Sequence, residues 1–169
     1  MPTVDELKNQ PVEYIQSVYF HDPGRFTAQD LLELCASKKT GIDIHEWLSG
    51  ALGMDVANLE MAGAAVRTGN IKALDWIIEK NPDAFPSKNS LLDGIRTSFY
   101  STKATELVLW IFAKRPELLP DWERLQSLGS YNISLAMVER VKDYQRRKEW
   151  QLQVEQMDQE PLDEITRIG

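Results

Sequence analysis

The sequence predicts an all-α protein, a short α-solenoid of stacked helix-turn-helix units with a helical cap at each end. Three observations support this fold class. Apolar residues recur at helical spacing along the chain, and no run of alternating apolar and polar residues marks a strand. The eight prolines and nine glycines fall mostly between the periodic segments, where they end helices. In addition, one helix and its exit turn occur twice, 34 positions apart.

The repeated segment is "AVRTGNIKALDWIIEKNPDAF" (residues 65–85) in its first copy and "LVLWIFAKRPELLP" (residues 107–120) in its second. Trp76, Lys80 and Pro82 of the first copy, and Pro86 directly after it, return as Trp110, Lys114, Pro116 and Pro120. The residue before a proline is disfavoured in the α region, so the helices are predicted to end at Asn81 and Arg115. Each copy therefore predicts an amphipathic helix followed by a proline turn.

The apolar residues of each copy share one helical face, because they fall at i, i+3, i+6 and i+7. In the first copy they are Ile71, Leu74, Ile77 and Ile78, and at the 34-residue offset Thr105, Val108, Ile111 and Phe112 take the same face. A shorter helix precedes each copy, "NLEMAGAAVRTGN" (58–70) and "SLLDGIRTSF" (90–99). The sequence therefore predicts two adjacent antiparallel helix pairs.

Weaker units flank these two pairs. One is "AQDLLELCASKKTGIDIHEWLSGALGMD" (28–55), and the other begins at "DWERLQSLGSYNISLAMVERVKDY" (121–144). The chain thus contains about four units between residues 27 and 148, each near 33 residues. Units of this size cannot bury their apolar faces alone, so we expect them to stack side by side.

The segment "AVRTGNIKALDWIIEKNPD" resembles the second half of an ankyrin repeat, whose pattern is A-A-x-x-G-[HN]-[LI]-x-x-[VL]-x-x-L-L-x-x-G-A-D. The residues that fit in register are Ala64, Ala65, Gly69, Asn70, Ile71, Leu74, Ile77, Ile78, Glu79 and Asp83. The Thr-Pro-Leu-His opening is missing, and Asn81 or Arg115 replaces the usual left-handed glycine. The resemblance covers roughly residues 27–145. Another array of helical hairpins remains the alternative.

We expect one domain, residues 1–169, with three parts. Residues 1–26 form an N-terminal cap, residues 27–148 the ankyrin-like repeats, and residues 149–169 a polar C-terminal helix and tail. The outer face of a terminal repeat must be solvated, which suits this polar ending. Two helix starts are predicted from capping patterns, Thr3 with Glu6 and Thr27 with Asp30.

Composition restricts the partners and the compartment. The net charge is −7, from 26 acidic and 19 basic residues, which disfavours nucleic acid and favours a partner protein with a basic surface. No apolar run approaches the roughly 18 residues of a membrane span, and no secretory signal is visible. The only cysteine, Cys35, cannot form an internal disulfide. We therefore expect a cytoplasmic protein with no membrane contact.

No catalytic residue, metal or cofactor is predicted. His21 lies beside a turn, and His45 and Glu46 point to different sides of a predicted helix. Cys35 lies on an apolar stripe and is interpreted as a small buried residue. The tryptophans of the second helices, Trp47, Trp76 and Trp110, are interpreted as packing between units. An aromatic groove for a small apolar molecule is the alternative.

The resemblance implies a non-enzymatic module, an adaptor, inhibitor or effector that binds a partner protein through its concave face and connectors. Carried over by position, the partner-binding residues are Arg67, Phe85, Lys88, Asn89, Arg96, Phe99, Tyr100, Leu119, Trp122 and Arg124. Phe85 and Leu119 could instead plug the core beneath their turns. The alternative function is a small helical enzyme or small-molecule-binding protein with a pocket of tryptophan and tyrosine side chains. The identity of the partner and the oligomeric state stay open.

Overall fold

The computed structural model describes residues 2–97, 101–119 and 135–158. Within these ranges every regular element is helical and there is no strand, so the predicted all-α class is confirmed. The elements are α1 (Val4–Leu7), α2 (Val12–His21), η1 (Pro23–Arg25), α3 (Ala28–Ala36), α4 (Asp43–Leu52), α5 (Leu59–Thr68), α6 (Ile71–Lys80), η2 (Pro82–Ala84), α7 (Lys88–Thr97), α8 (Ser101–Lys114), η3 (Pro116–Leu118) and α10 (Leu135–Asp158). The start of the predicted last unit, residues 121–134, lies outside the described residues.

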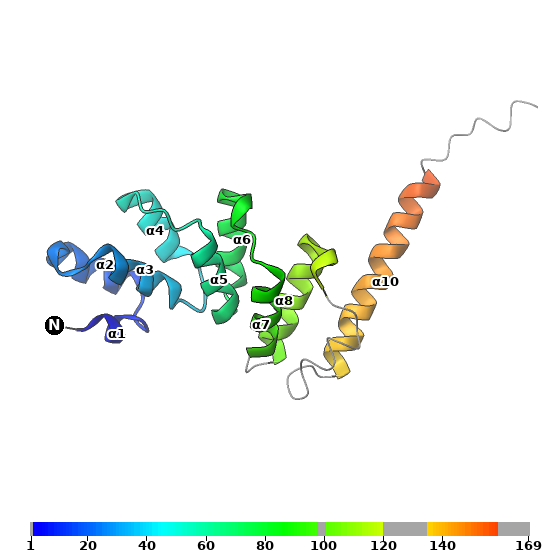
Figure 1. Ribbon diagram of the computed structural model, residues 1–169, viewed down its shortest axis with the longest axis horizontal. Coiled ribbons are helices and arrows are strands. Elements are labelled where there is room, and N and C mark those ends of the chain that lie inside the picture. Colours follow the sequence, from blue (N-terminus) through cyan, green and yellow to red (C-terminus); the bar gives the residue numbers. More distant parts are fainter. Residues whose placement is uncertain (1, 98–100, 120–134, 159–169) are drawn as a thin grey trace, which may run out of the picture.

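The helices from α3 to α8 are arranged as three successive pairs along the long axis of the molecule (Figure 1). Within a pair, α3 contacts α4, α5 contacts α6, and α7 contacts α8. Between pairs, α5 contacts both α3 and α7, and α6 contacts α8. A turn of only two residues, Gly69 and Asn70, joins α5 to α6, so these two helices run antiparallel.

Helix starts follow the predicted capping patterns. Thr3 Oγ1 accepts a hydrogen bond from the Glu6 amide at 3.3 Å, while the Glu6 carboxylate accepts one from the Thr3 amide at 2.6 Å. Thr27 and Asp30 make the same reciprocal pair at the start of α3. Both predicted caps are therefore confirmed.

Helix ends also follow the prediction. α6 ends at Lys80 and α8 at Lys114, and each is followed by a short 3-10 turn that begins at a proline. Asn81, at the end of α6, also donates from Nδ2 to the Ala57 carbonyl at 2.8 Å. This hydrogen bond joins the segment after α6 to the segment before α5, so the two ends of the α5–α6 pair are held together.

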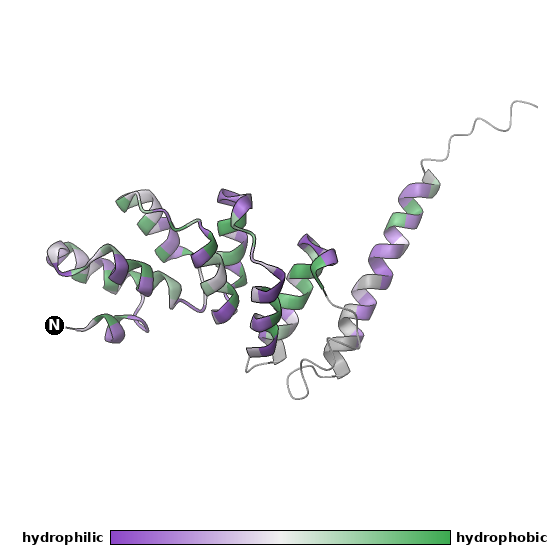
Figure 2. Ribbon diagram, viewed as in Figure 1, coloured by the Kyte–Doolittle hydropathy of each residue, from purple (hydrophilic) through white to green (hydrophobic). Residues whose placement is uncertain are grey.

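One core runs through the pairs. Leu74 and Ile77 of α6 are fully buried, as are Leu107 and Val108 of α8. α7 packs so closely on α5 that a Cβ at Gly94 would collide with the Val66 side chain. Figure 2 shows hydrophobic residues throughout the paired helices, whereas α10 beyond its first turns is mostly hydrophilic.

α10 differs from the other helices in length and environment. It contacts α8, with Phe112 and Tyr144 in an edge-to-face ring contact at 5.3 Å, and its remaining turns extend away from the pairs (Figure 1). The helix crosses the predicted boundary between residues 148 and 149 without a break. The polar segment therefore continues a helix that starts against the array.

Candidate protein-binding surface

The array has two edges, which are formed by different kinds of turn. The loop edge consists of the turns inside the pairs, residues 37–42 and 67–72, together with the adjoining ends of α7 and α8 at 96–97 and 101–103. The connector edge consists of the segments that join each pair to the element after it, residues 53–58, 81–87 and 115–119.

The structure divides the predicted binding residues between these edges. Arg67 and Arg96 lie in the last turns of α5 and α7, at the loop edge. Phe85 and Leu119 lie in the connectors. Lys88 and Asn89 come shortly after Phe85, in the first turn of α7. The other predicted residues, Phe99, Tyr100, Trp122 and Arg124, lie outside the described residues.

The aromatic residue of the connector edge is packed rather than free. The Phe85 ring stacks on the Trp110 ring at 5.3 Å, with an interplanar angle of 17°. The Arg115 guanidinium lies 5.0 Å from the centre of the Phe85 ring, within the range of a cation–π contact. Leu119 is likewise half-buried against the core. Both side chains therefore help to hold their connectors in place.

Lys88 and Asn89 are exposed at the start of α7. Arg67 and Arg96 are exposed at the ends of their helices, which contact each other. Arg96 forms an ion pair with Asp93 at 2.8 Å. The Arg67 guanidinium lies beside Gly63, which has no side chain that could cover it. These four residues are therefore available to a partner.

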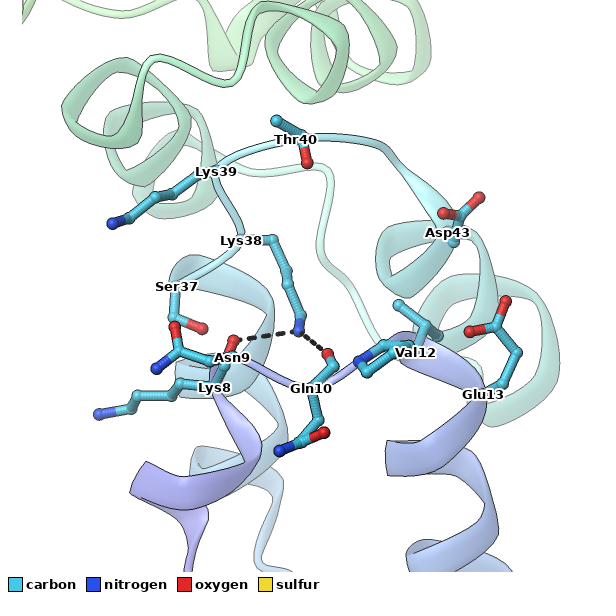
Figure 3. A pocket seen from close by; sticks show the side chains of 11 residues that line it. Lys8, Asn9, Gln10, Val12, Glu13, Ser37, Lys38, Lys39, Thr40 and Asp43 are labelled. Carbon is cyan, nitrogen blue, oxygen red and sulfur yellow. Dashed lines mark hydrogen bonds between the residues drawn. The ribbon is translucent and has the colours of Figure 1, made fainter. Parts of the chain in front are cut away.

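The loop edge is held together by polar side chains that bond to the backbone of the preceding turn. The first is Lys38, whose Nζ donates to the carbonyls of Lys8 at 3.1 Å and Gln10 at 2.6 Å (Figure 3). Burial of this ammonium lowers the pKa of Lys38. The contact joins the α3–α4 turn to the segment between α1 and α2.

Two further contacts repeat this arrangement along the edge. Asn70 Nδ2 donates to the carbonyls of Lys38 at 3.3 Å and Gly41 at 2.9 Å, and Asn70 is itself only 2% exposed. Lys103 Nζ donates to the Thr68 carbonyl at 2.9 Å. Each turn is thus bonded to the one before it, from the N-terminal cap to α8.

Sequence reasoning missed this row of contacts. Its only sequence signal is spacing, because Lys38, Asn70 and Lys103 are separated by 32 and 33 positions, close to one repeat. The acceptors are backbone carbonyls, which every residue has, so no residue pattern identifies them.

The loop edge is the more basic of the two. It contains no acidic residue and six basic ones, Lys38, Lys39, Arg67, Lys72, Arg96 and Lys103. The connector edge is mixed, because Asp55, Asp83 and Glu117 stand against Arg115, and the adjoining helix ends add Lys80, Lys88 and Lys114. A net charge of −7 for the chain therefore conceals a locally basic strip.

An open groove of about 420 Å³ adjoins the first turn of the loop edge (Figure 3). Its walls are the segment from Lys8 to Glu13 and the segment from Ser37 to Thr40, with Asp43 at one end. Lys8 is paired with Asp5 and Glu33, and these hydrogen bonds raise the pKa of its ammonium. The groove therefore offers polar groups of both signs.

The titratable groups with catalytic potential are in the core or apart from one another. Cys35 is 1% exposed, and burial raises the pKa of its thiol to about 12. His45 is 2% exposed, 5.7 Å from the Trp76 ring, and burial lowers its pKa to about 4. His21 is exposed at the end of α2. The interpretation of Cys35 as a buried residue is confirmed.

The three repeated tryptophans contact neighbouring elements. Trp47 packs edge-on against Tyr19 at 5.4 Å, and Trp76 lies beside His45 of the previous pair. Trp110 Nε1 donates to the Asp75 carboxylate of the previous pair at 2.8 Å. These contacts agree with packing between units.

Within the described residues no group of three or more His, Cys, Asp or Glu side chains could hold a metal ion. No described helix is long and apolar enough to cross a membrane. No family model matches the chain, and neither a curated protein nor a solved structure matches it significantly. Any functional conclusion therefore depends on the contacts and charges of this chain.

Proposed function

We propose that this protein is a non-enzymatic interaction module, an ankyrin-like array that binds a partner protein through its exposed edges and the first helices of its pairs. The observation that carries the proposal is the row of contacts made by Lys38, Asn70 and Lys103. It bonds successive turns into one continuous edge, which is the kind of extended surface that stacked repeats provide.

Further features support an ankyrin-like array. The helices of the α5–α6 pair have ten residues each and are joined by Gly69, in the left-handed conformation with φ of 69°, followed by Asn70. These two residues stand at the glycine and Asn positions of the ankyrin pattern. The proline turns after α6 and α8 differ from that pattern. An array of other helical hairpins would present the same two edges.

The states of the nucleophilic and basic groups favour binding over catalysis. A cysteine needs a thiolate to act as a nucleophile, and Cys35 with a pKa of about 12 is protonated at neutral pH. His45 is buried between helices, where a substrate has no access. Catalysis requires several such groups to converge in a pocket, and these two are in the core.

The overall charge favours a partner with a basic surface, but the distribution of charge refines this expectation. Six acidic residues and one base lie in residues 149–169, so this segment accounts for most of the net −7. A basic surface on the partner would be attracted mainly to the C-terminal segment. The array itself has a mixed surface with a basic loop edge.

The experiment is affinity capture from the native cell, followed by affinity measurement with one variant for each edge. We expect Lys88→Glu at the connector edge or Arg96→Glu at the loop edge to weaken partner binding by tenfold or more, about 1.4 kcal/mol. Gln153→Ala on α10 is the control and should bind as the wild type does. A captured partner that is insensitive to both charge reversals would refute the proposed surface, and substrate turnover by the purified chain would refute the non-enzymatic class.

A further inference from the structure

Most cations of the loop edge lack an acidic partner among the described residues, and they lie on an edge whose segments contain no acidic residue. Elsewhere in the described chain, ion pairs involve Lys8, Lys114, Arg115, Lys142 and Arg146. Among the described residues of the loop edge, Arg96 alone is paired, to Asp93. The other five, none of which pairs with a described carboxylate, are Lys38, Lys39, Arg67, Lys72 and Lys103.

These five cations belong to one strip, since hydrogen bonds join their turns. Asn70 connects the 67–72 turn to the 38–41 turn, and Lys103 connects the start of α8 to Thr68. The Lys103 stem also lies against Gly69, where an added Cβ would be 2.8 Å from its Cδ. In Figure 1 the α5–α6 turn and the start of α8 lie on the same side of the array.

Two of the cations are fixed and three are free to contact a ligand. Lys38 and Lys103 donate to neutral backbone carbonyls, which hold the ammonium groups in place without cancelling their charge. Lys39, Arg67 and Lys72 are exposed. Several positive charges along one edge, with no acidic residue among them, attract an anionic occupant.

We propose that the loop edge binds an acidic segment of a partner protein, whose carboxylates pair with Lys39, Arg67 and Lys72. The proposal rests on the proposed interaction function and specifies the partner's chemistry at this edge. Bidentate carboxylate pairing suits the Arg67 guanidinium, and the two lysines act as point charges on either side of it along the chain.

A peptide fits this strip better than a nucleic acid does. Asp43 and Glu13 line the neighbouring groove (Figure 3). Their carboxylates would repel a continuous phosphate backbone, whereas the carboxylates of a peptide can be spaced so that they avoid this groove.

The test uses a fluorescein-labelled peptide of alternating glutamate and serine, titrated with the full chain while its anisotropy is measured. The variant of the strip is Lys39→Glu/Arg67→Glu/Lys72→Glu. The matched control is Lys80→Glu/Arg147→Glu/Lys148→Glu, which also reverses two lysines and one arginine and changes the net charge equally. All six side chains lie outside the core, so both variants are expected to fold. Circular dichroism verifies this.

We expect the wild type and the control to bind the peptide at low salt, and the strip variant to bind at least tenfold more weakly. Binding should weaken as salt rises toward about 150 mM, where the Debye length is near 8 Å. Equal losses in the two variants, or no binding by the wild type, would overturn the proposal. Tighter binding of a single-stranded DNA oligonucleotide of equal length would replace it with a nucleic-acid surface.

The outcome can be separated from that of the proposed function. A partner captured from cells that binds the strip variant as well as the wild type would overturn the acidic-segment proposal and leave the interaction module intact. Loss of that partner in the strip variant, with the control unaffected, supports both. If every captured partner is insensitive to changes at both edges, the interaction surface itself is wrong.

Discussion

The α5–α6 pair and helix α10 contrast in how their residues are used. The pair has two helices of ten residues, and Ala62, Leu74 and Ile77 are completely buried. α10 has 24 residues, yet Trp150 is 66% exposed and Met157 is 73% exposed. Helix length is therefore a poor guide to burial in this chain. Packing between neighbouring pairs stabilises the short helices, which would be marginal in isolation.

The largest effect is expected from a cavity in the pair. Leu74→Ala removes a side chain with no exposed surface from the face that α6 presents to the core. We expect the free energy of unfolding to fall by about 2–5 kcal/mol, since the surrounding helices cannot collapse completely onto the gap. Urea denaturation of wild type and variant measures the difference. A loss below about 1 kcal/mol would mean that α6 is not packed as described.

The second effect is a loss of folding stability as the pH falls. The pKa of buried His45 is lowered to about 4, whereas an unfolded histidine titrates near 6.5. The neutral form is therefore favoured in the folded state. Its stabilisation is fully present above about pH 6.5 and is lost as the pH falls from there toward 4, because the unfolded chain takes up the proton first. Between about pH 7.5 and 5 the loss should be about 2 kcal/mol.

Urea denaturation at both pH values measures this loss, and His45→Gln is the control. The variant has a lower stability at neutral pH but no ionisation at this position, so its pH dependence across the window should be flatter. The carboxyl groups of Glu6, Asp30 and Glu117 have lowered pKa values and titrate below this window. The same slope in wild type and variant would exclude His45 as the source.

Much of the fold was accessible from sequence because it depends on local chemistry. The caps at Thr3 and Thr27 and the helix ends before Pro82 and Pro116 are decided by residues within four positions of each other. Burial of Cys35 followed from the apolar spacing of α3. These features need no knowledge of which helices touch.

The candidate surface was less accessible, since it depends on contacts between distant residues. The bond from Asn70 to the Gly41 carbonyl joins residues 29 positions apart and has no signature in the acceptor. The stacking of Phe85 on Trp110 likewise depends on the register of two pairs. The boundary predicted at residue 148 followed a change in polarity, but α10 continues across it because its 24 residues form a long helix rich in strong helix formers, which depends less on burial than a short one does.

The third effect tests the joint between pairs. Asn70 is buried, caps α6 by accepting from the Ala73 amide at 3.2 Å, and donates to two carbonyls of the preceding turn. Asn70→Ala leaves these groups without their partner, and we expect a loss of about 1–3 kcal/mol. Asn89→Ala, at an exposed position of α7, is the matched control and should change the melting temperature little. Equal shifts for the two variants would argue against a structural joint at Asn70.

The smallest effect is expected on α10 itself. Gln153 is exposed and alanine has the higher helix propensity, so Gln153→Ala should change the free energy of unfolding by no more than about 0.5 kcal/mol. Urea denaturation at two protein concentrations provides the measurement. A loss above about 1 kcal/mol would show that this part of α10 is packed in solution. If that loss became smaller on dilution, the packing would be between copies of the chain, with exposed side chains such as Trp150 at the contact. An unchanged stability at both concentrations would leave α10 as a solvated helix that contributes little beyond its contact with α8.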